Sequence, residues 1–206
     1  MPVSGARGPI PKNPYAQLSD WMNYVEFRLK NLEGGSARGL RGRLLELVEL
    51  DATDFTFDIT NISQNFQNLE LIWAAYSAAA SDSTREIRMH FNGDTSAAYT
   101  RQYSTDGTET QTLGTANGCK IGDIDGGLLN GEAAGWCHIY DYAEINNRKV
   151  TLGQAFSASG LAVARLETSN IWQNGSGEAI DQLTITIGNG GTTSFRAGSK
   201  FWLYAF

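Results

Sequence analysis

The sequence predicts a mainly β protein: an antiparallel β-sandwich preceded by an extended N-terminal arm and a short coiled-coil helix. Three observations indicate this architecture. After residue 43, apolar residues recur mainly with the period of two that is typical of half-buried strands. Clusters of Gly, Asn, Asp, Ser and Thr separate these segments, as turns require. All four prolines and a single heptad pattern precede residue 34, so composition already divides the chain.

The first 17 residues are expected to form an extended basic arm. The stretch GPIP at 8–11 cannot begin a helix or a central strand, because proline fixes φ and lacks an N–H donor. The arm has too little apolar area to fold alone, so we expect it either to be disordered or to lie along a partner. Its anchoring residues are expected to be Arg7, Pro9, Pro11 and Lys12.

Residues 18–33 are expected to form a short helix that self-associates. Ser19 or Asp20 can cap its N-terminus, and two glycines follow its end. A helix of about 15 residues is marginal alone in water, so it must bury its apolar side against something. The spacing between successive apolar residues of this segment alternates between four and three, which is typical of a coiled-coil seam. The seam residues are Leu18, Met22, Val25, Leu29 and Leu32.

The residues around this seam favour a parallel trimer. With Leu18 at position d, Arg28 falls at g and Glu33 at the following e, the spacing of a salt bridge between parallel helices. Leu29 at a and Val25 at d is not the arrangement that favours dimers. The alternative is an amphipathic helix that packs on its own β-domain. Two heptads leave both arrangements open.

A glycine-rich linker at 34–43 is expected to join the helix to a head at 44–206. Asn92-Gly93-Asp94 is a hairpin-type turn signal, and the polar stretch 104–118 is expected to be a long exposed loop or hairpin tip. The apolar C-terminal segment is expected to be buried in a sheet. Eleven strands are predicted in the head: 44–50, 54–60, 69–76, 86–92, 99–104, 119–124, 135–142, 148–156, 161–168, 181–188 and 200–206.

Charge separates the head from the N-terminal part. Residues 1–43 carry a net charge of +4, whereas residues 44–206 carry −10. Phosphate contacts come mainly from Lys and Arg, so an acidic head disfavours nucleic-acid binding. The basic beginning of the chain can contact either nucleic acid or an acidic protein groove. No apolar run approaches the ~20 residues that span a bilayer, and the first 14 residues lack the apolar core of a secretory signal.

Few residues suggest catalysis or metal binding. The two histidines, His90 and His138, lie in predicted strands, where a lone histidine is usually structural. His138 follows Cys137, but neighbouring strand residues point to opposite faces and do not pair as base and nucleophile. Cys119 and Cys137 are expected to be small buried hydrophobes. We therefore expect no catalytic residue, no metal ligand and no cofactor.

One tryptophan differs from the others in its surroundings. Trp73, Trp136 and Trp202 lie in apolar strands and are expected in the core, whereas polar residues surround Trp172. An aromatic ring beside amide side chains is typical of a sugar-binding site, so Trp172, Gln173 and Asn174 are the candidate glycan contacts. The alternative is that the ring folds back onto the edge of the sandwich.

Two motifs resemble a recurrent domain of tailed-bacteriophage virion proteins. They are Met89-His90-Phe91-Asn92-Gly93-Asp94-Thr95, followed by Tyr99 and Tyr103, and the ending Phe195-Arg196-Ala197-Gly198-Ser199-Lys200-Phe201-Trp202-Leu203-Tyr204. Those domains carry an "RFNGD" hairpin, spaced tyrosines and a last strand of the type "GSRFTLYG". His90 replaces the usual basic residue, and Trp202 is bulkier than the usual polar one. The resemblance covers roughly residues 44–206 and implies a jelly-roll-like β-sandwich with no catalytic residues.

The resemblance implies a non-enzymatic virion protein, made in the bacterial host cytoplasm and displayed on a tail or particle surface. Its expected partners are two further copies of itself, other virion proteins through the arm, and a host-surface glycan through the head. We expect no membrane insertion. Two alternatives remain: a capsid decoration protein that stabilises the shell, and a head that degrades a polysaccharide.

Overall fold

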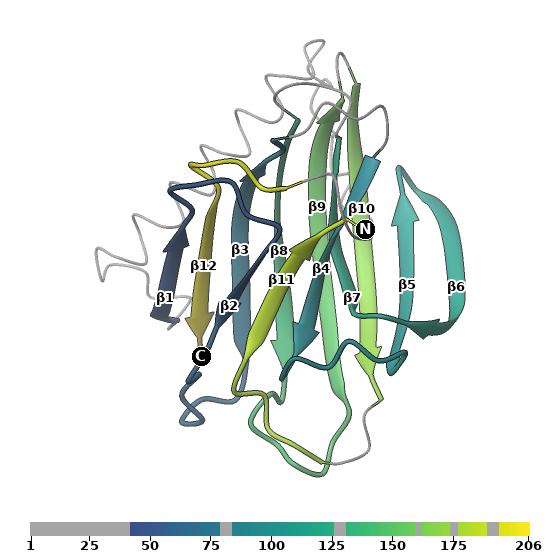
Figure 1. Ribbon diagram of the computed structural model, residues 1–206. Coiled ribbons are helices and arrows are strands. Elements are labelled where there is room, and N and C mark those ends of the chain that lie inside the picture. Colours follow the sequence, from purple (N-terminus) through teal and green to yellow (C-terminus); the bar gives the residue numbers. More distant parts are fainter. Residues whose placement is uncertain (1–41, 79–83, 126–130, 160–161, 174–176, 189–193) are drawn as a thin grey trace, which may run out of the picture.

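The computed structural model describes residues 42–78, 84–125, 131–159, 162–173, 177–188 and 194–206 (Figure 1). These residues form two antiparallel sheets, and none of them is helical. This confirms the prediction of a mainly β head with antiparallel sheets. The predicted arm (1–17), the predicted helix (18–33) and most of the predicted linker lie outside the described residues.

The described residues form twelve strands. They are β1 (Arg43–Glu49), β2 (Thr56–Ile59), β3 (Leu69–Tyr76), β4 (Thr84–Phe91), β5 (Tyr99–Thr105), β6 (Thr108–Ala116), β7 (Cys119–Asp125), β8 (Glu132–Tyr140), β9 (Lys149–Ser159), β10 (Ala162–Trp172), β11 (Leu183–Ile187) and β12 (Lys200–Ala205).

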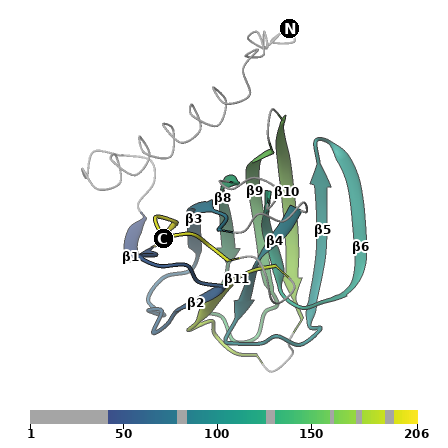
Figure 2. The ribbon, with the colours of Figure 1, turned by 45° about the horizontal axis from the view of Figure 1, so that its top comes forward.

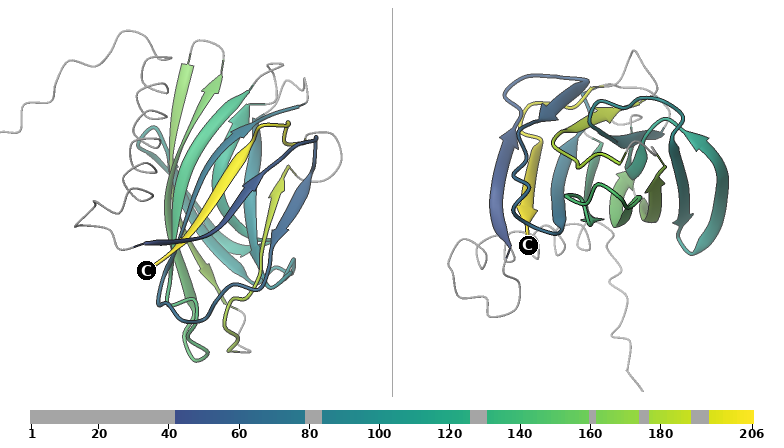
Figure 3. Two further views of the ribbon diagram at one scale, coloured as in Figure 1. Left: turned by 90° about the vertical axis from the view of Figure 1, so that its left-hand side faces the viewer. Right: turned by 90° about the horizontal axis from the view of Figure 1, so that it is seen from below.

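The strands form one large and one small sheet, seen as two layers in Figures 2 and 3. The large sheet has eight strands in the order β1-β12-β3-β8-β9-β10-β5-β6, and the small sheet has four in the order β2-β11-β4-β7. The first and last described strands pair with each other, so the chain enters and leaves the head at one edge of the large sheet. The β5–β6 hairpin forms the opposite edge (Figure 3, right).

Strict alternation of side chains builds the core between the sheets. In β4, Ile87, Met89 and Phe91 are fully buried, whereas Glu86 and Arg88 point to the opposite side and are half-buried. Successive side chains of a strand point to opposite faces, so one set of alternate residues enters the core. The burial of each of these large side chains stabilises the folded state by roughly 1.5–3 kcal/mol.

Trp73 lies fully buried at the centre of this core, and two glycines make room for its ring. A Cβ atom at Gly135, its partner in β8, would come within 2.6 Å of the ring, and one at Gly122 in β7 within 2.5 Å. Real Cβ atoms do not approach other atoms so closely, so both positions require glycine. The indole therefore spans from one sheet to the other.

The predicted turn at Asn92-Gly93 is present, and it connects the two sheets. Both residues have positive φ, and the Asp94 N–H donates to the Phe91 carbonyl at 2.9 Å, as in a type I′ turn. The Tyr99 hydroxyl fastens this turn by accepting from the Phe91 N–H and donating to the Asp94 carbonyl. The turn does not form a hairpin, because it joins β4 of the small sheet to β5 of the large sheet.

All eleven predicted strands are present, and β6 is a twelfth that the sequence analysis missed. The stretch 104–118 was expected to be a loop or hairpin tip, but Thr108–Ala116 pairs with β5. Polar residues such as Thr and Gln hide the alternation of this edge strand. The turn before β6 could have been predicted, because Asp-Gly is a preferred hairpin dipeptide. In the structure, Asp106 and Gly107 both have positive φ.

The cysteines and the C-terminus lie as expected. Cys119 and Cys137 are free and fully buried. Burial raises the pKa of the Cys119 thiol and raises that of Cys137 to about 12, so both thiols stay protonated at neutral pH. At the end of the chain, Phe201, Leu203 and Ala205 are buried, and the Phe206 N–H donates to the Asn68 carbonyl at 3.0 Å.

Candidate interaction surface

A row of large apolar side chains crosses the outer face of the eight-stranded sheet. Leu47 of β1 pairs with Trp202 of β12, Trp202 with Ile72 of β3, and Ile72 with Trp136 of β8. Tyr204 lies two residues from Trp202 on the same side of β12. We call these five residues the aromatic face. Strands far apart in the sequence supply it, so it exists only in the folded sheet.

The aromatic face forms a second apolar cluster, separate from the core. Phe201 and Leu203 turn inward into the core, which places Trp202 and Tyr204 on the outside. Ile72 and Tyr204 are nevertheless buried, with 4% and 1% of their surface exposed, and the half-buried rings of Trp136 and Trp202 pack against them. Ile72 and Tyr204 are thus the covered part of this cluster, and the rings of Trp136 and Trp202 are its accessible part.

A hydrogen-bonded pair of polar side chains borders the aromatic face. The His138 Nε2 lies 2.9 Å from Glu70 Oε1, and Glu70 is opposite both His138 and Tyr204 in the sheet. The His138 ring packs against Trp136 at 4.9 Å and against Phe206 at 5.7 Å. This polar pair gives an otherwise apolar surface a fixed direction for hydrogen bonding.

Exposed hydrophobic residues gather around the same surface. Six large hydrophobic side chains are exposed in the described residues, and Leu44, Leu47, Leu152 and Phe206 lie on this side or edge of the large sheet. Contiguous exposed apolar surface marks sites of protein or ligand contact, whereas scattered single residues do not. The outer side of the large sheet is thus the best candidate for an interaction surface.

The outer face of the small sheet has the opposite character. Asp58, Thr184 and His90 lie side by side across β2, β11 and β4. The Thr184 hydroxyl donates to Asp58 Oδ1 at 2.5 Å. His90 Nε2–H donates to the Asn117 carbonyl at 2.9 Å, because the carbonyl can only accept. Polar groups on this face bind one another.

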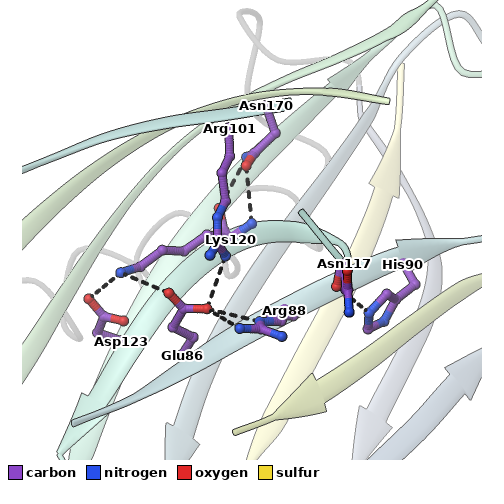
Figure 4. Close-up of polar contacts among 8 residues, drawn as sticks. All are labelled: Glu86, Arg88, His90, Arg101, Asn117, Lys120, Asp123 and Asn170. Atoms are coloured by element: carbon purple, nitrogen blue, oxygen red, sulfur yellow. Dashed lines mark hydrogen bonds and ion pairs between the residues drawn. The ribbon is translucent and has the colours of Figure 1, made fainter. Parts of the chain in front are cut away.

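A cluster of five charged side chains completes this polar face (Figure 4). Glu86 lies at its centre, 2.6 Å from Arg88, 3.0 Å from Arg101 and 3.7 Å from Lys120. Lys120 also contacts Asp123 at 2.9 Å. We call Glu86, Arg88, Arg101, Lys120 and Asp123 the ionic cluster. It joins β4 and β7 of the small sheet to β5 of the large sheet.

Asn170 and Tyr103, both in the large sheet, contact Lys120 at the free edge of β7. The Asn170 amide accepts from the Lys120 N–H and donates to the Lys120 carbonyl, both at 3.1 Å, and also donates to the Thr151 hydroxyl at 2.9 Å. It thereby replaces a neighbouring strand at an edge that would otherwise leave backbone groups unpaired. The Lys120 ammonium lies 4.1 Å from the centre of the Tyr103 ring. The ionic cluster therefore serves to hold the two sheets together.

Burial and charge act in opposite directions on the two carboxylates of the cluster. Burial alone would raise the pKa of Glu86, but the hydrogen bond from Arg88 and the charges of Arg101 and Lys120 outweigh it, and the net pKa is lowered. Burial raises the pKa of Asp123 more than Lys120 lowers it. Glu86 is therefore the firmly ionised centre of the cluster.

Trp172, the predicted sugar contact, lies in the core. Only 2% of its surface is exposed, its ring stacks near Tyr99 and meets Phe91 edge-on, and its Nε1–H donates to Asp94 at 2.8 Å. No ring face remains for a sugar, so the glycan role of Trp172 is wrong and the alternative, a ring folded back onto the sandwich, holds. Gln173 is exposed and donates to Thr100, and Asn174 lies outside the described residues.

Two residues of the aromatic face, Trp136 and Trp202, were expected in the core. Of the three tryptophans expected there, Trp73 is fully buried, whereas Trp136 and Trp202 lie on the outer face. The continuous apolar run around Trp202 hides the alternation that separates inner from outer side chains. A strict period of two separates Trp202 from Phe201, but the sequence does not say which of the two faces the core.

The remaining predicted site residues lie outside the described part of the chain. These are the seven residues assigned to trimerisation, Leu18, Met22, Val25, Arg28, Leu29, Leu32 and Glu33, and the four assigned to anchoring, Arg7, Pro9, Pro11 and Lys12. Within the described ranges, no three His, Cys, Asp or Glu side chains are grouped as metal ligands. The same ranges contain no helix with the length and apolar character needed to cross a bilayer.

No family model matches the chain, and no curated protein matches it.

Proposed function

We propose that this chain is a non-enzymatic structural protein of a tailed-bacteriophage particle. In this proposal residues 44–206 form a jelly-roll-like head displayed on the tail or particle surface, and residues 1–17 anchor it to other virion proteins. One observation supports an assembly role above others: the aromatic face begins at β1, the strand through which residues 1–42 join the head. A surface suited to protein contact thus lies where the preceding part of the chain joins the head.

The contrast between the two outer faces supports the same proposal. A displayed head needs one side that contacts the particle or its own copies and one that faces solvent. The polar face, with its ionic cluster, binds its own charges internally and suits the solvent side. The aromatic face suits the contact side.

We further infer that residues 18–33 hold three heads together. The seam from Leu18 to Leu32, with Arg28 and Glu33 beside it, is the basis of this inference. Multi-angle light scattering on the full chain is expected to give about three times 22.4 kDa. A mass of 22.4 kDa at micromolar concentration would exclude the trimer.

Particle association is tested by sedimentation. In a lysate of the phage that encodes the chain, the full-length protein is expected to band with particles in a density gradient. A variant lacking residues 1–17 is expected to remain soluble and folded but to stay at the top of the gradient. If the shortened chain still bands with particles, the anchor assignment is wrong; if neither form does, the virion assignment is wrong.

The position of the head on the particle separates the two virion roles. Density for the head at the tail favours an attachment element, whereas density over the capsid lattice favours decoration. Host-glycan binding remains part of the attachment role, with its contacts elsewhere than Trp172. A glycan array with the full chain tests that part directly.

A further inference from the structure

The rings of Trp136 and Trp202 remain partly exposed on the aromatic face, and Gly42 shows where the chain adjoins this face. Gly42, the last described residue before β1, lies against the Tyr204 side chain: a Cβ atom at Gly42 would be 3.6 Å from Tyr204 Cβ and 3.9 Å from its ring. Tyr204 belongs to the aromatic face. Gly42 therefore lies at the edge of this surface.

The length of chain before Gly42 allows the preceding segment to cover the surface. Eight residues, 34–41, separate Glu33 from Gly42, and an extended chain spans up to about 3.3 Å per residue. Neighbouring strands are about 4.8 Å apart, so β8, three strands from β1, lies only about 15 Å away across the sheet. Residues 18–33 can therefore reach every residue of the aromatic face.

The sequence of residues 18–33 contains a second apolar row beside the seam. At about 100° per residue on a helix, Trp21, Tyr24 and Phe27 follow one another in steps of about 60°, so the row starts beside the seam of Leu18 and Val25 and winds towards the side opposite it. The opposite flank carries Ser19, Asn23, Glu26, Lys30 and Glu33. A coiled-coil seam needs only a narrow apolar stripe. Trimerisation through the seam would therefore leave the aromatic row unburied, and its burial requires a second contact surface.

We propose that residues 18–33 form a helix whose Trp21-Tyr24-Phe27 row docks on the aromatic face of the same chain. The row then meets Trp136, Trp202 and Tyr204, so that aromatic rings lie on both sides of the contact, where edge-to-face pairs add to the burial of apolar area. The seam stays free to meet sister helices. Docking does not depend on the trimer, but it fixes the direction in which each head leaves the bundle.

Photo-cross-linking of the full chain tests this docking. A benzophenone amino acid in place of Tyr24 is expected to cross-link, within one chain, to peptides containing β3, β8 or β12. The matched control places the same group at Asn23, one residue away on the polar flank, where we expect at most a tenth of that yield. The double substitution Trp136→Ala and Trp202→Ala is expected to reduce the yield at position 24 several-fold.

Each other outcome overturns the docking proposal. Cross-links from position 24 to residues 18–33 of another copy, to these strands of another copy, or to other parts of the head contradict it, as do equal yields at positions 23 and 24 or no cross-link at all. Val25→Asp separates docking from the trimer: it should reduce the light-scattering mass to 22.4 kDa while the cross-link at position 24 persists. A wild-type mass of 22.4 kDa with the cross-link present excludes the trimer alone.

Discussion

The outer faces of the two sheets arise from the same alternation of side chains but meet their surroundings in opposite ways. On the small sheet, the outward positions of β4 and β7 carry Glu86, Arg88, Lys120 and Asp123, and each of these charges finds its partner within the head. On the large sheet, the outward positions of β3, β8 and β12 carry large apolar groups. Charges can neutralise one another within a face, whereas apolar surface can only be covered.

This difference indicates that the polar face stabilises the fold and that the aromatic face contacts a partner. The ionic cluster and Asn170 act across the gap between the sheets, so their loss should affect folding. The aromatic face lies outside the core, so its loss should affect assembly more than folding. Four measurements test this division.

Asn170→Ala is expected to have the largest effect on folding. The substitution removes both hydrogen bonds to the edge of β7 and the one to Thr151. Each buried group left unpaired costs about 1–3 kcal/mol, so we expect the free energy of unfolding to fall by about 4 kcal/mol. Denaturant unfolding followed by circular dichroism measures the change. Ser169→Ala, at the adjacent half-buried position, is the control and should change stability little.

Lys120→Met is expected to lower the free energy of unfolding by about 3 kcal/mol, because it leaves the half-buried Asp123 without its counter-charge. The matched control is Lys200→Met, which removes an ion pair of similar length with Glu49 on the exposed edge of the large sheet. Exposed pairs contribute at most about 1 kcal/mol. Equal losses for the two variants would show that the ionic cluster does not hold the sheets together.

Trp202→Ala should affect folding less than either, by about 1–2 kcal/mol, because only part of the ring is buried and the side chain lies outside the core. In the full chain the same substitution should weaken the cross-link from position 24. Unfolding and cross-linking measured on one sample compare the two effects. A loss of stability above about 4 kcal/mol, as for a core tryptophan, would place this ring in the core.

The pH dependence of stability should show the smallest effect, and it belongs to the polar face. Burial lowers the pKa of His90 below its ordinary 6.5. The unfolded chain then binds the proton more tightly, so this contribution to stability is complete above pH 6.5 and is lost as the pH falls towards the folded pKa. One proton limits the slope to about 1.4 kcal/mol per pH unit. His90→Gln should remove this part of the slope between pH 6.5 and 5; an unchanged slope would contradict the assignment.

Local patterns predicted much of the fold. The alternation in 54–60, 86–92 and 181–188 identified three of the four strands of the small sheet, and Asn92-Gly93 identified a turn. β6 escaped because its Thr and Gln side chains show no alternation. The candidate surface escaped for a different reason: an apolar residue of a strand looks the same whether it will face the core or the outside.

The sequence by itself therefore determined eleven of the twelve described strands, the turn at Asn92-Gly93 and the division of the chain into a basic beginning and an acidic head. These properties depend on neighbours within a few residues. Only the tertiary structure decided that Trp172 packs behind Phe91 and Tyr99 while Trp136 and Trp202 meet across Ile72 on an outer face. Strand order sets which faces are covered, and strand order results from pairing between segments far apart along the chain.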